Sequence, residues 1–237
     1  MHFDAEFWHG HFERTLPNEM HQIIDALKSR ILPQFENITA EAVNVSNSMW
    51  NHPPMDRFSE DADMSDLAEA ATEAGYEHYA LMSGLCQGIV NMFAASLFHL
   101  HEQHLMLFYK RQLHDMRTPL DRASLRPTMV ISKLEIMGID VKGMKSWAAL
   151  YEIESLANSV KHGDGRSAQN LKEKRPDFFK NPNQSDLLEA GDFLALDKPI
   201  LGDGLYVKPS DLDGIKNAIV NFWRELFSEM KKLEATT

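Results

Sequence analysis

Apolar residues recur every three or four positions through most of the chain, which is the period of an amphipathic α-helix. The pattern predicts helices over residues 17–32, 33–50, 127–137, 144–162, 167–174 and 210–233. Proline, asparagine or glycine stands at most of the predicted ends, where these residues are tolerated better than in a helix interior. We therefore expect an all-α protein.

The longest helical pattern begins at Ser65, the predicted N-cap, and continues for about fifty residues with three glycines in it. Two helices and one kinked helix both fit this pattern. Apolar residues occupy nearly every side over residues 85–109, which predicts the central and most buried helix.

Two regions depart from helical spacing. Residues 53–64 are polar and acidic, as in a loop, and residues 193–207 carry a strand pair, LALDKPI and LYVK, around Gly-Asp-Gly. The predicted fold is an all-α helical bundle with a small irregular or hairpin insert before the C-terminal helix. We expect an N-terminal arm over residues 1–16, packed on the body or on a second subunit, and a single domain over residues 17–237.

Composition limits the cellular setting. The 237 residues are 43% hydrophobic and 25% charged, as in ordinary soluble proteins, and the single Cys86 favours a buried, inert thiol in a reducing compartment. The N-terminus lacks the apolar core of a signal peptide, and no window reaches about 18 uncharged apolar residues, so we expect a cytoplasmic protein with no membrane contact. The net charge of −11 argues against nonspecific nucleic-acid binding, although a local basic patch is compatible with it.

Familiar cofactor and metal motifs are absent. In the histidine-rich run FHLHEQH, His101 and His104 are three apart, whereas a zinc-binding helix needs two histidines four apart beside a glutamate. There is no second Glu-x-x-His helix for a di-iron site, no nucleophile elbow and no phosphate-binding glycine loop. We therefore expect neither a metal nor a cofactor.

Polar residues gather at the end of the helix predicted over residues 144–162 and form the first candidate site. Lys161 and His162 favour the negative end of the helix dipole, and glycine follows where a left-handed cap is cheapest. A C-cap explains those residues, but it leaves Asn158 and Glu154, one turn and two turns before His162 respectively, without a reason. A cap alone and a cap combined with a functional site both remain open.

Glu102 is the second candidate, because helical spacing places its carboxylate among apolar neighbours. A buried carboxylate is costly unless it is paired. Glu102 is therefore either a salt-bridge or cap partner, or a site acid that faces Lys161 or His162.

Four segments together resemble the HEPN-type helical domains of prokaryotic toxin–antitoxin and phage-defence proteins. They are LFHLHEQ (residues 97–103), ANSVKHGDGRSAQNL (157–171), KRPDFF (174–179) and ILGDGLYVKPSDLDGIKNAIVNFWREL (200–226). The resemblance covers about residues 75–233. It implies a helical bundle that forms a homodimer and, in active members, a metal-independent endoribonuclease in which an arginine and a histidine act on RNA at the dimer cleft.

The chain keeps the Asn-x-x-x-His part of that pattern as Asn158 and His162, but Ala157 stands where the arginine is usual. Two hypotheses follow. In the first, the protein is a ribonuclease with His162 as acid–base, Asn158 orienting it and Lys161 contacting phosphate. In the second, it is a catalytically degenerate interaction module in which Glu102, Asn158 and His162 form a buried polar network and the partner is another protein.

Overall fold

The computed structural model describes residues 5–54, 63–115, 119–120, 125–182, 196 and 198–236. This part of the chain is all-α and contains no β-strand, which confirms the predicted fold class. Its α-helices are α1 (Ala5–Gly10), α2 (Leu16–Ala26), α3 (Ile38–Asn51), α4 (Met64–Phe108), α5 (Pro127–Ile136), α6 (Trp147–His162), α7 (Arg166–Lys174) and α8 (Asp211–Thr236). Shorter π-helical and 3-10 segments extend or join them: η1 (His11–Thr15), η2 (Leu27–Ile31), η3 (Leu32–Phe35), η5 (Tyr109–Leu113), η6 (Pro176–Phe179) and η7 (Pro199–Leu201).

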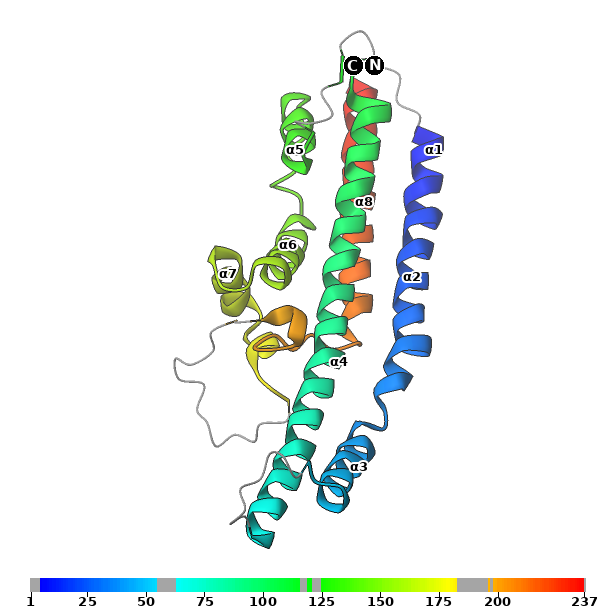
Figure 1. Ribbon diagram of the computed structural model, residues 1–237. Coiled ribbons are helices and arrows are strands. Elements are labelled where there is room, and N and C mark those ends of the chain that lie inside the picture. The colour runs from blue at the N-terminus through cyan, green and yellow to red at the C-terminus, as the bar shows by residue number, and fades with distance from the viewer. Residues whose placement is uncertain are drawn as a thin grey trace.

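The long helices define the shape of the molecule. Figure 1 shows α2, α4 and α8 as rods along its length, with α4 beside α8. The shorter helices α5, α6 and α7 lie on the other side of α4 from α2, and α3 packs along the first part of α4. Buried apolar side chains of α1, α2 and α4 to α8 form a single core cluster, whose described members include none from α3.

The N-terminal helix crosses the boundary predicted between residues 16 and 17. α1, η1 and α2 follow one another without a break. Trp8 and Phe12 are 1% and 2% exposed, and the Phe12 ring stacks on Trp223 of α8 with centroids 3.7 Å apart. Of the two placements predicted for the arm, the structure has packing on the body. Residues 5–16 are part of the bundle core because their aromatic side chains complete it.

α4 is one continuous helix of 45 residues, so the two-helix alternative is wrong. The predicted N-cap at Ser65 is wrong as well. The carboxylate of Asp63 accepts hydrogen bonds from the backbone N–H groups of Ser65 and Asp66, and the Asp66 side chain reciprocates. This capping box satisfies N–H groups that would otherwise be free at the helix start.

The helical stretch Met64–Leu113 contains an 18-residue window with a mean hydropathy of 1.5, of which 39% is buried within the structure. By length and composition it is able to cross a membrane, contrary to the expectation that no window would qualify. The core helix of a bundle passes the same test, so cytoplasmic location without membrane contact stays a prediction.

Polar atoms within the aromatic core have partners. The indole Nε1 of Trp223 donates to Nδ1 of His101 over 3.0 Å, and the indole Nε1 of Trp8 donates to Oε1 of Gln112, also over 3.0 Å. His101 is 2% exposed, and burial lowers its pKa to about 3. His101 is therefore neutral near physiological pH, and its Nδ1 serves as a hydrogen-bond acceptor in the core.

Glycines let the backbone of α4 touch the turn that precedes α8. A Cβ atom at Gly88 would overlap the carbonyl oxygen of Ile200, and one at Gly84 would lie 2.6 Å from the carbonyl oxygen of Leu201. From the opposite side, Gly202 has a φ of +81° and faces the carbonyl oxygen of Gly84. Side chains larger than hydrogen do not fit between the two backbones at these positions.

Asn91, one turn beyond Gly88, holds the same segment through its side chain. It is fully buried; its amide nitrogen donates to the carbonyl oxygens of Pro199 and Leu205, each over 2.9 Å, and its Oδ1 accepts from Val207 N–H over 3.4 Å. The strand pair predicted over residues 193–207 is absent from the described part of that range. Residues 198–203 form turn hydrogen bonds, and the backbone of Pro199, Leu205 and Val207 bonds to the Asn91 side chain in place of a strand ladder.

The packing at Gly88 gives a test of the fold. Gly88→Ala is expected to lower the free energy of unfolding by about 1–3 kcal/mol, because the new methyl group forces the two backbones apart. Gly214→Ala is the matched control: it is also helical, has open space around it, and should stabilise the protein by roughly 0.5–1 kcal/mol. Urea unfolding followed by circular dichroism measures both. Equal effects at the two positions would contradict the proposed contact.

Candidate functional site

The helix that carries the predicted site, α6, begins on contacts from α8. Oε1 and Oε2 of Glu225 accept hydrogen bonds from the backbone N–H groups of Lys145 and Ser146, over 2.9 and 2.8 Å. At the other end Gly163 has a φ of +69°, a conformation that favours glycine and ends the helix there. The predicted end at His162 is confirmed.

The apolar side of α6 faces the core nearly as predicted. The buried residues of the helix are Leu150, Ile153, Ser155, Leu156, Ala157, Ser159 and Val160. Leu150 belongs to this buried side, whereas its neighbour Ala149 is exposed. The two buried serines donate to backbone carbonyl oxygens four residues earlier, so the core side contains no unpaired hydroxyl from them.

The predicted site residues lie at the outer face of α6. Asn158 is half-buried, whereas Lys161 and His162 are exposed. None of the three makes a side-chain hydrogen bond to another described residue. His162 therefore has the solvent access that an acid–base group needs, but nothing in the described part of the chain orients its ring.

Glu102 has a different partner from the one predicted. Its carboxylate pairs with Nδ1 of His99, one turn earlier on α4, over 2.9 Å, and its side chain is 28% exposed. No hydrogen bond joins it to Asn158, Lys161 or His162. The hydrogen-bond network expected among Glu102, Asn158 and His162 is therefore wrong, because the Glu102 carboxylate pairs with His99 on its own helix.

Glu102 does approach α6 closely enough to affect Glu154. Burial, followed by the negative charge of Glu102, raises the pKa of Glu154 above its usual value. Two carboxylates thus lie close together one turn below Asn158. A negatively charged phosphodiester bound at this place would meet both of them, with Lys161 as the nearby cation and no arginine at position 157.

The neighbouring helix α7 is fixed against α6 by polar contacts. The side-chain amide of Asn170 donates to the Tyr151 hydroxyl over 3.0 Å, and the Lys174 ammonium lies 4.8 Å from the centroid of the same ring. Arg175 pairs with Glu152 of α6 over 3.3 Å and with Asp177 over 2.8 Å. These cations are held by α6 and its neighbours, so they do not replace the missing arginine.

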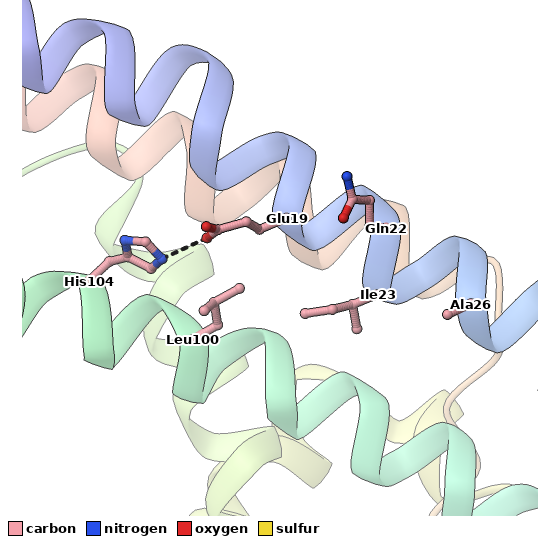
Figure 2. A pocket seen from close by; sticks show the side chains of 6 residues that line it. All are labelled: Glu19, Gln22, Ile23, Ala26, Leu100 and His104. Atoms are coloured by element: carbon pink, nitrogen blue, oxygen red, sulfur yellow. Dashed lines mark hydrogen bonds and ion pairs between the residues drawn. The ribbon is translucent and has the colours of Figure 1, made fainter.

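A groove between α2 and α4 is a second candidate that the sequence did not indicate. Its volume is about 480 Å³, and Figure 2 shows Ile23, Ala26 and Leu100 along it, with Glu19 and His104 at one end. Oε2 of Glu19 and Nε2 of His104 are 2.9 Å apart, and His104 is 8% exposed. The spacing of His101 and His104 predicts no zinc site, and Glu19 is one of the polar residues of the helix predicted over residues 17–32.

The spacing of His11 and Glu19 in the sequence does not predict that their side chains meet at this end of the groove. His11 and Glu19 are eight residues apart, which in an uninterrupted α-helix places them about 80° apart around the axis. The π-helical segment η1 lies between them and is wound more loosely, so each of its residues rotates less. Both side chains consequently reach His104, and no helical period of the sequence indicates that meeting.

Within the described part of the chain, no group of three or more histidine, cysteine, aspartate or glutamate side chains is arranged to hold a metal ion. Comparison of the sequence with protein-family profiles and with curated proteins, and of the fold with solved structures, finds no match. The resemblance to HEPN-type domains thus stays a prediction, and function has to be argued from the geometry.

The acidic pair predicts a pH-dependent effect. A carboxyl whose pKa is raised by folding binds its proton more tightly when folded, so its charge destabilises the fold above that pKa and the penalty is relieved as pH falls. Glu154→Gln is therefore expected to raise the free energy of unfolding at neutral pH, by up to about 1 kcal/mol for a half-exposed pair. The gain should vanish near pH 4, about the ordinary glutamate pKa.

Urea unfolding at the two pH values measures this. Glu152→Gln on the same helix is the control, because Glu152 pairs with Arg175 and its loss should leave stability unchanged or lower. A Glu154→Gln protein that is less stable than the wild type at neutral pH would show that the two carboxylates do not repel.

Proposed function

We propose that this protein is a HEPN-like helical module that acts by binding protein, with a second copy of its own chain as the first partner. The observation that carries the proposal is the distribution of exposed apolar side chains. Among the described residues, ten of the fourteen exposed large hydrophobic side chains lie on α3, on the first 29 residues of α4 or on η7. Monomeric proteins rarely expose such a concentration unless it serves an interaction.

Five of these residues form what we call the α4–η7 patch: Leu81, Leu85, Met92, Ile200 and Leu201. The first three share one side of α4, because positions four and eleven residues apart fall within about 40° of one another around a helix. The two η7 residues lie next to them, since Gly84 and Gly88 contact the backbone of Leu201 and Ile200. The patch is therefore continuous across two segments distant in sequence.

Charge favours a second copy as the occupant. The chain has a net charge of −11, yet residues 78–101 contain no aspartate, glutamate, lysine or arginine. Two copies that meet along this stretch of α4 bury no formal charge of their own. Two-fold dimers use the same patch on both subunits and are the commonest oligomers, and the resemblance to a dimer-forming family agrees.

RNA cleavage by His162 is the competing function. Its support is the solvent access of His162 and the exposed cation Lys161 next to it in the sequence. Against it stand the carboxylates Glu102 and Glu154, which repel a phosphodiester, and the absence of an arginine fork able to hold the phosphate. The α4–η7 patch thus supports binding of a second copy better than the surroundings of His162 support catalysis on RNA.

A charge placed in the patch tests the proposed association. Leu85→Glu is expected to weaken self-association at least about tenfold, because each copy would bury a carboxylate in an apolar contact. Ile136→Glu on α5 is the control, since Ile136 is 80% exposed and lies outside the patch. Sedimentation velocity over a range of concentrations measures both. A wild type that stays monomeric at tens of micromolar would refute the dimer.

RNA cleavage is tested separately with purified wild type and His162→Ala. Total RNA incubated with wild type in the presence of a chelator is expected to remain intact, because the site lacks an arginine and holds two carboxylates. His162→Ala should also unfold like the wild type, since its side chain is exposed and has no partner among the described residues. Chelator-resistant cleavage that is lost in His162→Ala would establish the ribonuclease and overturn the proposal that the protein acts by binding alone.

A further inference from the structure

Three side chains form a hydrogen-bonded chain between the N-terminal helix and α4. Nε2 of His104 is 2.9 Å from Oε2 of Glu19, and Nδ1 of His104 is 2.9 Å from Nε2 of His11. His104 is nearly buried, while Glu19 and His11 are half-buried. Neither of the functions argued above uses this Glu19–His104–His11 chain.

The partners fix where the protons lie when both rings are neutral. A carboxylate only accepts hydrogen bonds, so Nε2 of His104 carries the hydrogen and donates it to Glu19. Nδ1 of His104 is then an acceptor, which requires Nε2 of His11 to donate. The lone pair of His11 is consequently on Nδ1, the one ring nitrogen in the chain that is not engaged.

The surroundings leave this nitrogen available. Nδ1 of His11 makes no hydrogen bond within the described part of the chain, and it is not among the buried unpaired atoms there. Burial, and then the charges of His104 and Arg111, lowers the pKa of His11, although Glu19 acts in the opposite direction. His11 is therefore an unprotonated imidazole near neutral pH, with a guanidinium close enough to influence its charge.

We propose that His11 is a phosphoryl-accepting histidine that reacts through Nδ1 with small donors of the phosphoramidate or acyl-phosphate class. Arg111 supplies the positive charge that attracts the anionic donor, as arginine does in phosphate recognition. His104 and Glu19 are positioning residues that fix the reactive tautomer of His11. The exposed ring of Phe7 stacks on one face of the His11 imidazole, with ring centroids 6.0 Å apart.

The step is a substitution at phosphorus. The Nδ1 lone pair of His11 forms a bond to the phosphorus atom of phosphoramidate as the donor's phosphorus–nitrogen bond breaks, and that electron pair leaves with ammonia. The His11 ring becomes positively charged. Its Nε2 hydrogen bond to His104 spreads this charge, and the proton is able to pass to His104, whose other nitrogen already faces the Glu19 carboxylate.

The test treats the full chain with potassium phosphoramidate near neutral pH and follows each histidine by peptide mass spectrometry, with phosphorus NMR to assign the nitrogen. The exposed His21, His52 and His162 serve as references within the same molecule. His11 is expected to react fastest and at Nδ1, despite its partial burial. Glu19→Gln should slow His11 by about tenfold through the lost charge-assisted hydrogen bond, with the His162 rate unchanged.

Asp25→Asn is the matched control, because it removes an exposed carboxylate from the same helix away from His104. It should leave the ratio of the His11 and His162 rates at its wild-type value. The proposal fails if His11 reacts no faster than His162, or if Glu19→Gln leaves that ratio unchanged. Circular dichroism of each variant under the labelling conditions verifies that it is folded, because unfolding would also slow His11 relative to the exposed His162.

Discussion

The contact between the α4 backbone and the η7 turn is the constraint on which the rest of the structure depends. Gly84 and Gly88 allow the close approach, and Asn91 replaces the missing backbone hydrogen bonds of the segment that leads into α8. This contact sets where α8 begins, and with it the position of Trp223 in the core. It also brings Ile200 and Leu201 beside the exposed apolar side of α4, so the same packing that closes the fold creates the α4–η7 patch.

A second constraint is the winding of the N-terminal helix. Phe12 stacks on Trp223. Glu13 forms a bidentate ion pair with Arg224, whose Nε and Nη2 donate to Oε1 and Oε2 over 2.8 and 2.9 Å. These contacts fix residues 12 and 13 against α8, and the π-helical winding of η1 then turns His11 and Glu19 toward the same point on α4. The N-terminal helix contacts α8 through Phe12 and Glu13 and α4 through His11 and Glu19. An uninterrupted α-helix would not direct these side chains to both helices at once.

Helical periodicity predicted the elements well because amphipathic spacing is a local property: α5, α6 and α7 begin and end within a few residues of expectation. Helical periodicity did not predict contacts that depend on tertiary packing. The expected strand pair is replaced by bonds to Asn91, the expected arm is core because of Trp223, and Glu102 pairs with His99 instead of the end of α6. Asn158, Lys161 and His162 lie near one another as the helix period requires, but the acidic character of their surroundings depends on packing against α4.

Two parts of α4 therefore have different chemistry on one rigid element. Residues 81–92 carry the uncharged patch, and residues 101–104 carry the buried His101 and His104. Met92 and His104 are twelve residues apart, which corresponds to about 18 Å along a helix, and they point to sides about 120° apart. A second copy bound at the patch thus leaves Nδ1 of His11 open. Because α4 is continuous and its glycines are locked against η7, the proposed self-association would add a neighbour to the molecule without altering the Glu19–His104–His11 geometry.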